Sequence, residues 1–304
     1  MSELRFDGRV AVITGAGGGL GREHALLLAS RGASVVVNDL GASPSGEGGD
    51  EGPAAHTARE IGERGGAAVA DTSDVATPEG GEAVVAAALE AFGRVDIVVN
   101  NAGFLRDKAF HNMTPDLLRP LLAVHVEGAF NVTRPAWVRM REQGYGRVVF
   151  TTSSSGILGN FGQSNYGAAK TALIGLTRVL AIEGARSDIK VNAIAPLART
   201  RLTDHLMGSV GERLDPRLVS PVVAWLAHAE CPVSGEVFAA GGGRVARFFT
   251  GMTPGMFDPD LTVEAVRDHA DLIRSEEGYT TPGTLTEEIT ELFARFSEQD
   301  AGEA

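Results

Sequence analysis

A tyrosine, a lysine and a serine lie at a spacing that suits proton exchange with a carbonyl or hydroxyl oxygen. Tyr166 and Lys170 are four residues apart in SNYGAAK, so a helix places both on one face. Ser153 lies thirteen residues before the tyrosine. We expect Tyr166 to be the acid/base and the Ser153 hydroxyl to hold the substrate oxygen and stabilise developing negative charge.

A tyrosine that exchanges protons near neutral pH needs its pKa lowered from about 10 toward 7, which corresponds to about 4 kcal/mol. An ammonium about 4 Å away supplies roughly that at an effective dielectric of 20. Lys170 is therefore expected to lower the pKa of Tyr166 and to hydrogen-bond ribose hydroxyls. A Tyr-x-x-x-Lys pair alone is more often an ordinary surface pair, so the interpretation depends on a second motif.

That second motif is TGAGGGLG, which starts at Thr14 and predicts a cradle for dinucleotide phosphates. Glycines allow positive φ and a close backbone approach to a pyrophosphate. The N-terminus of the following helix adds N–H groups and partial positive charge. The residues assigned to this turn are Gly15, Gly19, Leu20 and Gly21.

An acidic residue, Asp39, ends the second apolar run, eighteen residues beyond Gly21. A carboxylate there accepts ribose hydroxyls and repels a 2′-phosphate, which predicts NAD rather than NADP. The alternative is a plain turn residue at the end of a strand. Further cofactor contacts are expected after later runs, at Asp74, Val75, Asn101, Ala102, Gly103 and Pro196. Together with the Tyr–Lys pair, these residues predict hydride transfer to or from a nicotinamide.

Short apolar runs alternate with helical patterns along the chain and predict the elements that position this site. The runs cover residues 10–14, 34–39, 67–70, 95–100, 147–152, 189–195 and 236–240. Their β-branched, continuously apolar character is typical of parallel strands covered on both faces. We therefore predict an α/β fold, a doubly wound parallel seven-stranded Rossmann sheet with helices on both faces and a helical C-terminal extension.

The expected domain boundary follows residue 248. Residues 1–248 form the dinucleotide-binding and catalytic domain, and residues 249–304 form the extension, with helices near 263–274 and 286–296. The apolar stretch Phe248, Phe249, Met252, Met256 and Phe257 either lines an acyl or sterol pocket or seats those helices, and we favour the seating.

Composition excludes several classes of function. The 304 residues carry a formal net charge of −12, which argues against nucleic-acid binding. No apolar run is long enough for a membrane span, and no metal site is expected. The single cysteine, Cys231, allows no internal disulfide. With neither a signal core at the N-terminus nor a peroxisomal tripeptide at the end of the sequence, we expect a cytoplasmic protein.

Two groups of residues have two readings each. The glycine-rich, acidic segment 41–53 is either the rim of the cofactor site or a flexible surface insertion. Four arginines could contact phosphates of a coenzyme A substrate, although each alone is more typical of a solvated loop: Arg199, Arg201, Arg244 and Arg247.

The motifs resemble those of the short-chain dehydrogenase/reductase superfamily over residues 5–245. The matching features are TGAGGGLG, Asp74, NNAG, Ser153, Tyr166 with Lys170, and Pro196. Longer stretches, such as AFGRVDIVVNNAGFLRDKAF and TSSSGILGNFGQSNYGAAK, are similar to the (3R)-hydroxyacyl-CoA dehydrogenase unit of the peroxisomal multifunctional enzyme type 2 group (the 17β-hydroxysteroid dehydrogenase type 4 group).

The resemblance implies NAD-dependent oxidation of a 3-hydroxyacyl-CoA, of fatty or steroid origin, by a homodimer or homotetramer. The alternatives are a dehydrogenase or reductase of free steroids or ketones, and a catalytically silent NAD-binding partner subunit. Two positions depart from the superfamily pattern. His125 stands where an asparagine usually supports a proton relay, and either serves the relay or packs the helix. Leu197 follows Pro196 where glycine is usual, which affects the loop beside the nicotinamide.

Overall fold

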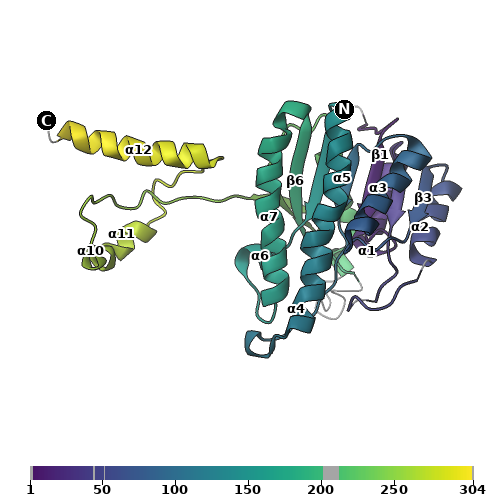
Figure 1. Cartoon of the computed structure of the whole chain (residues 1–304), viewed down its shortest axis with the longest axis horizontal. Helices are drawn as coiled ribbons and strands as arrows, with labels where there is room; N and C mark the ends of the chain where they lie inside the picture. The colour runs from purple at the N-terminus through teal and green to yellow at the C-terminus, as the bar shows by residue number, and fades with distance from the viewer. Residues whose placement is uncertain (1–2, 44, 51, 201–211, 303–304) are drawn as a thin grey trace. The chain divides into compact units, whose positions relative to one another are not determined.

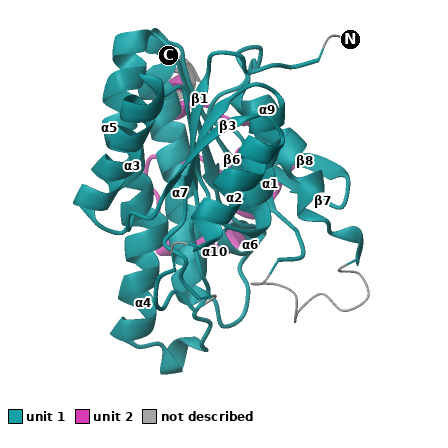
Figure 2. Ribbon diagram, turned by 90° about the vertical axis from the view of Figure 1, so that its right-hand side faces the viewer, with its two compact units in different colours: residues 1–247 teal, residues 248–304 magenta. Residues whose placement is uncertain are grey.

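The structure is a computed structural model that describes residues 3–43, 45–50, 52–200 and 212–302. It divides into two compact units, Met1–Arg247 and Phe248–Ala304 (Figure 2). The first unit carries the sheet and every residue that we assigned to catalysis or cofactor binding. Each unit is described by itself.

A single sheet with the strand order β3-β2-β1-β4-β5-β6-β7-β8 organises the first unit (Figure 1). Strands β3 through β7 pair in parallel. The chain order reverses between β1 and β4, which is where ligands bind in open α/β sheets. The strands are β1 Val10–Thr14, β2 Ser34–Asn38, β3 Ala67–Asp71, β4 Ile97–Asn100, β5 Gly146–Thr151, β6 Ile189–Pro196, β7 Val237–Gly241 and β8 Arg244–Phe248.

The expected fold is confirmed, but the prediction of seven strands was wrong by one. The described residues contain β8, which follows β7 after two glycines with φ of 57° and 83°. This strand lies at the edge of the sheet and is mostly exposed. An exposed edge strand lacks the continuous apolar run that identifies buried parallel strands, so its sequence RVARF appeared to be an arginine-containing loop.

Helices cover both faces of the sheet. Helices α1, α2 and α9 lie on one face, and α3, α5 and α7 lie on the other (Figure 2). Two short helices, α4 and α6, complete the first unit near the site. Their bounds are α1 Gly19–Ser30, α2 Gly52–Glu63, α3 Pro78–Phe92, α4 Pro115–Leu122, α5 Gly128–Gln143, α6 Ser154–Leu158, α7 Ser164–Gly184 and α9 Ser220–Ala227.

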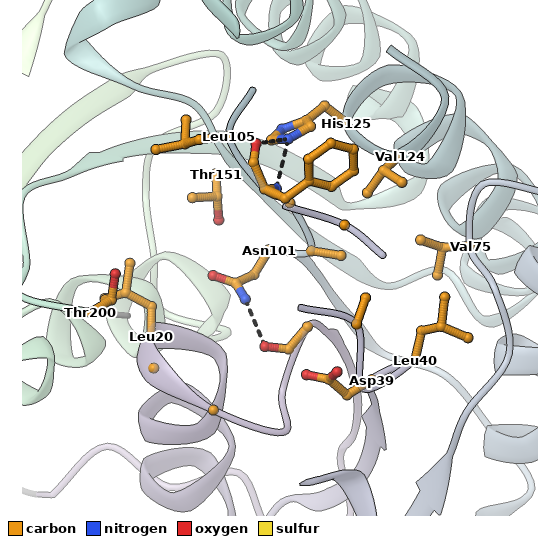
Figure 3. Close-up of a pocket in the computed structure, with 18 of the residues that line it drawn as sticks. Leu20, Asp39, Leu40, Val75, Asn101, Leu105, Val124, His125, Thr151 and Thr200 are labelled. Carbon is orange, nitrogen blue, oxygen red and sulfur yellow. Dashed lines mark hydrogen bonds between the residues drawn. The ribbon is translucent and has the colours of Figure 1, made fainter. Parts of the chain in front are cut away.

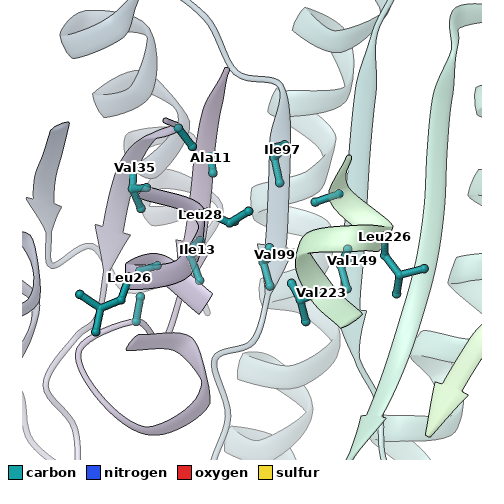
Figure 4. Close-up of a cluster of buried hydrophobic side chains, with 14 of the residues drawn as sticks. Ala11, Ile13, Leu26, Leu28, Val35, Ile97, Val99, Val149, Val223 and Leu226 are labelled. Atoms are coloured by element: carbon teal, nitrogen blue, oxygen red, sulfur yellow. The ribbon is translucent and has the colours of Figure 1, made fainter. Parts of the chain in front are cut away.

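A large hydrophobic core lies between the sheet and helices α1 and α9 (Figure 4). Alternate strand residues, such as Ile13, Val35 and Val99, pack there against Leu28 and Val223. The intervening residues of the same strands are also buried, because the second helical layer covers them. This burial of both faces explains why the strands read as unbroken apolar runs.

The second unit contains α10 Val263–Asp268, α11 Ala270–Arg274 and α12 Leu285–Gly302. The helix expected at 263–274 is broken at His269, where the backbone turns to φ −106° and ψ 16°. The aromatic residues near its start pack within the unit, with Phe249 stacked on Tyr279 and Phe257 against Phe296. These contacts agree with a role in seating the helices. No helix of the described residues is long and apolar enough to cross a membrane.

Candidate active site

The glycine turn between β1 and α1 leaves space that only glycines allow. Gly15 and Gly19 have φ of 64° and 53°, which favour residues without a side chain. A Cβ on Gly21 would lie 2.2 Å from the Gly15 carbonyl oxygen, so α1 and the turn approach closely. The turn therefore presents bare backbone and a helix N-terminus to the cavity, which suits an anionic pyrophosphate.

Asp39 lies at the carboxyl end of β2 and faces this turn. One carboxylate oxygen accepts the Gly17 N–H at 2.8 Å, and the other accepts the Gly41 N–H at 2.7 Å. A Cβ on Gly17 would lie 2.8 Å from that carboxylate. The two backbone donors hold Asp39 at the mouth of the glycine turn.

The Asn-Asn-Ala-Gly segment after β4 is tied to the end of β1. The Asn101 side-chain amide donates to the Thr14 and Gly15 carbonyl oxygens at 3.0 and 3.1 Å. The Thr14 hydroxyl accepts the N–H groups of Asn101 and Ala102, each at 3.0 Å. We assigned Asn101 to cofactor contact, and the structure shows that its amide also stabilises the glycine turn.

Asp74 and Val75 line the same cavity after β3. One Asp74 carboxylate oxygen accepts the Ala76 N–H at 3.0 Å and shapes this turn. The Asn131 amide on α5 donates to the Val75 carbonyl oxygen at 3.0 Å. Val75 is thereby held at the wall of the cavity.

One cavity of about 460 Å³ brings the assigned residues together at the carboxyl ends of the strands (Figure 3). It is lined by Gly15, Gly19, Leu20, Asp39, Asp74, Val75, Asn101, Ala102, Gly103, Tyr166, Lys170 and Pro196. Gly21 and Ser153 are not in the lining. Sequence reasoning missed several other lining residues, among them Leu40, Phe104, Leu105, Val124 and Thr151. Ser43 and Gly46 also line the cavity and belong to the segment 41–53 that was considered as its rim.

The three residues assigned to catalysis come from the end of β5 and the first two turns of α7. The Ser153 hydroxyl accepts the Ser155 N–H at 3.1 Å, and the Ser153 side chain acts on the Tyr166 phenol by lowering its pKa. The Lys170 ammonium donates to the Thr151 carbonyl oxygen at 2.6 Å and lies 5.5 Å from the centre of the Tyr166 ring. The spacing seen in the sequence thus places all three side chains together.

The pKa values of this pair differ from our expectation. Burial raises the pKa of Tyr166, and the Ser153 side chain offsets part of that rise. The Asp107 carboxylate raises the pKa of this phenol further. Burial also lowers the pKa of Lys170 to about 7. Both groups are desolvated, which favours their neutral forms, and the expectation that Lys170 lowers the pKa of Tyr166 stays a prediction.

His125 contacts the catalytic tyrosine from a π-helical turn that connects α4 to α5. Its Nε2 lies 3.0 Å from both the amide nitrogen and the carbonyl oxygen of Phe104. Its ring meets the Tyr166 ring edge to face, with centroids 5.6 Å apart. Burial places the pKa of His125 well below its usual value. These contacts show helix packing, and a relay role stays a prediction.

Leu197 does not loosen the loop after β6. Its N–H donates to the Ala240 carbonyl oxygen at 2.8 Å, which extends the pairing with β7. A Cβ on Gly241 would lie 2.3 Å from the Leu197 carbonyl oxygen, so the two strands approach closely here. The Pro196–Leu197 segment is therefore held against β7 at the edge of the cavity.

The arginines considered for coenzyme A are dispersed. Arg244 and Arg247 belong to β8, and Arg247 pairs with Glu236 at 2.8 Å. The backbone N–H of Arg199 donates to the Leu214 carbonyl oxygen at 2.7 Å. Arg201 lies outside the described residues. Coenzyme A binding by these arginines stays a prediction.

Comparison with known proteins gives a family match over most of the sheet. A family model described as short chain dehydrogenase matches residues 9–208. The peroxisomal multifunctional enzyme type 2 of Mus musculus is 45% identical over 94% of this chain and 39% of its own length. A hydroxyacyl-CoA dehydrogenase of Mycobacterium tuberculosis is 36% identical over 79% of each chain.

The solved structure of full-length peroxisomal multifunctional enzyme type 2 from Drosophila melanogaster superimposes with a TM-score of 0.81 at 36% identity. The match covers 97% of this chain and 50% of that protein. The chain thus spans half or less of these two multifunctional enzymes.

Proposed function

Because the chain belongs to the short-chain dehydrogenase family, we propose that it oxidises the 3-hydroxyl group of a 3-hydroxyacyl-CoA with NAD⁺, using Tyr166 as the proton acceptor. The family and its relatives show an oxidoreductase with a nicotinamide cofactor. The observation that carries the finer proposal is the single cavity that joins Tyr166 and Lys170 to the glycine turn and Asp39.

The residues of the cavity fit a dinucleotide. The turn from Gly15 to Gly19 offers bare backbone and the N-terminus of a twelve-residue helix to the pyrophosphate. Asp39, held by two backbone N–H groups, suits ribose hydroxyls and repels a 2′-phosphate. This charge is why we propose NAD rather than NADP.

The chemistry needs a proton acceptor, a group that orients the substrate oxygen, and a dry site. When bound, NAD⁺ supplies the hydride acceptor and a positive ring charge, which favours an ionised phenol nearby. The Tyr166 phenolate takes the proton of the substrate hydroxyl, and the Ser153 hydroxyl holds the oxygen that becomes the carbonyl. Lys170 stays aligned through its bond to the Thr151 carbonyl oxygen.

Apolar walls exclude water from the reacting groups. Leu105, Val124 and Leu197 line the cavity near Tyr166. A lower local dielectric strengthens the hydrogen bonds that Ser153 and Tyr166 make to the substrate oxygen. The raised pKa of Tyr166 also makes the oxidation rate increase with pH, because only the ionised phenol accepts a proton.

The coenzyme A ester is proposed from relatives, since the mycobacterial protein is named a hydroxyacyl-CoA dehydrogenase. A cytoplasmic location is likewise a proposal. It differs from the location in the names of the multifunctional relatives, which are called peroxisomal. We also propose a homodimer or homotetramer. Helices α5 and α7 expose large apolar side chains on the same face of the sheet, namely Phe130, Val138, Val179 and Ile182, and such patches mark protein interfaces.

The deciding experiment measures NADH formation on matched pairs of substrates. Short, long and steroidal (3R)-3-hydroxyacyl-CoA thioesters are compared with the corresponding free hydroxy acids, each with NAD⁺ and with NADP⁺. We expect turnover of thioesters with NAD⁺ and weak turnover of free acids. Turnover of free ketones or steroids alone would replace the coenzyme A proposal. Absence of turnover with bound NADH would favour a silent NAD-binding subunit.

A further inference from the structure

The segment between β2 and α2 forms a closed loop with its own hydrogen bonds, here called the clamp loop (residues 41–43 and 45–50). Its two ends meet where the Asp50 N–H donates to the Leu40 carbonyl oxygen at 3.0 Å. A Cβ on Gly41, which has φ 72°, would overlap the Asp50 carbonyl oxygen. Surface loops with such close ends are compact and are frequently functional.

Inside the clamp loop the backbone is bonded across a tight turn. The Ser43 N–H donates to the Glu47 carbonyl oxygen at 2.8 Å, and the Gly46 N–H donates to the Ser43 carbonyl oxygen at 2.9 Å. The Ser43 hydroxyl accepts the Glu47 N–H at 3.1 Å. These bonds argue against the flexible insertion considered from the sequence and give the loop a defined inner face.

That inner face covers the part of the cavity beside Asp39. Ala42, Ser43 and Gly46 line the cavity, together with Leu40 at the neck. The opposite wall includes Phe104 and Leu105, which follow the Asn-Asn-Ala-Gly segment; Figure 3 shows Leu40 and Leu105 on different sides of the space. The adenosine half of a dinucleotide held by Asp39 would therefore lie under the clamp loop.

Two residues of the segment after β4, Phe104 and Arg106, contact the clamp loop. Gly46 lies against the Phe104 ring so closely that a Cβ there would be 2.7 Å from two ring carbons. The Arg106 guanidinium donates to the Ser45 carbonyl oxygen at 2.8 Å and to the Asp116 carbonyl oxygen on α4 at 2.9 Å.

Arg106 is well placed to hold the clamp loop in this position. Its guanidinium lies 5.1 Å from the centre of the Phe104 ring, and its side chain is only 16% exposed. The Glu47 carboxylate lies 4.0 Å from the Arg106 guanidinium, and the Glu47 side chain is 77% exposed, so water screens this pair of charges. The bond to the Ser45 carbonyl oxygen is therefore the principal contact of Arg106 with the loop.

We propose that Arg106 and Phe104 latch the clamp loop over the adenosine half of the dinucleotide, and that opening of this latch limits cofactor release. The proposal rests on the proposed use of a dinucleotide. Among the described residues, the contacts of Arg106 with Ser45 and Glu47 are the polar contacts between the loop and the segment after β4. Breaking the Arg106 bond should thus release the loop without changing the glycine turn.

The first test uses the ligand-free protein and hydrogen–deuterium exchange. Arg106→Ala should speed amide exchange in residues 41–50 about tenfold, because one charge-assisted hydrogen bond closes the loop. Exchange in the β1 and β4 strands should stay unchanged, which shows that the fold is intact. The matched control is Arg119→Ala, an exposed arginine on α4 that the structure does not bond to the loop.

The second test measures NADH release by stopped-flow fluorescence. Arg106→Ala should release NADH about tenfold faster, and Arg106→Lys, which keeps the charge but loses the forked donor, should lie between the variant and the parent protein. Arg119→Ala should leave the release rate unchanged. If Arg106→Ala fails to fold, Gly46→Ala serves instead, since its Cβ pushes the loop away from Phe104.

Unchanged loop exchange in both Arg106→Ala and Gly46→Ala would overturn the latch. Faster loop exchange with an unchanged NADH release rate would overturn the link to cofactor release. A parent protein that binds neither NADH nor NADPH would instead refute the proposed function, and the exchange experiment would still decide whether Arg106 fastens the loop.

Discussion

The Lys170 ammonium lies 5.5 Å from the centre of the Tyr166 ring, one helical turn further along α7, and donates to the Thr151 carbonyl oxygen. Lys170 is buried and Tyr166 is partly buried, and the loss of hydration raises the pKa of Tyr166 and lowers that of Lys170, which favours the neutral form of each. The pair therefore combines correct geometry with a strong desolvation cost. In our proposal, the positive ring of bound NAD⁺ and the charge that develops during the reaction favour ionisation of Tyr166.

The Tyr166 hydroxyl is expected to carry the proton transfer. Tyr166→Phe removes only that oxygen and should lower kcat by about 10²- to 10⁴-fold, the usual contribution of a positioned acid or base. The dissociation constant of NADH should change little, because the ring still fills the cavity wall. Steady-state turnover and fluorescence titration measure the two quantities. Tyr145→Phe is the matched control, since Tyr145 stacks between Arg9 and Arg147 before β5 begins. Equal turnover of Tyr166→Phe and the parent protein would refute the assignment.

Asp39 is expected to set the choice between NAD and NADP. Asp39→Asn keeps the shape and one acceptor for the backbone N–H groups of Gly17 and Gly41 but removes the charge. The ratio of kcat/KM for NAD⁺ to that for NADP⁺ should fall about tenfold or more, because a charged hydrogen bond and a repulsion are both lost. Asp74→Asn should leave this ratio unchanged, since we expect Asp74 to lie beside the adenine ring, which is common to both cofactors. A similar fall in both variants would contradict the specific role of Asp39.

The buried Lys170 is expected to make stability depend on pH. Its pKa is lowered from 10.5 to about 7 on folding, so between those values the unfolded chain binds more protons than the folded one. The free energy of unfolding should therefore rise with pH over this window, by about 2 kcal/mol from pH 7 to pH 9. Lys170→Met should lack this rise. Urea unfolding of the two ligand-free proteins at several pH values gives the difference, and a difference independent of pH would show that Lys170 is not desolvated in the folded chain.

The sequence predicted the catalytic group because its members are local in the chain. Tyr166 and Lys170 must share a helix face at a spacing of four, whatever the rest of the protein does. The apolar runs likewise predicted the strands β1 to β7, since strands buried on both faces have a distinctive composition. The edge strand β8 was missed because partial exposure removes that signal.

Other features depended on contacts between residues far apart in the chain. The amide of Asn101 bonds to Thr14 and Gly15, and Gly46 lies against Phe104; no local pattern reports such partners. Burial raises the pKa of Tyr166, whereas the sequence led us to expect a lowered pKa. Burial lowers the pKa of Lys170, a shift that the sequence did not predict. Spacing alone identifies which groups meet, whereas the charge that each one carries is set by how much water and how many other charges the folded chain leaves around it.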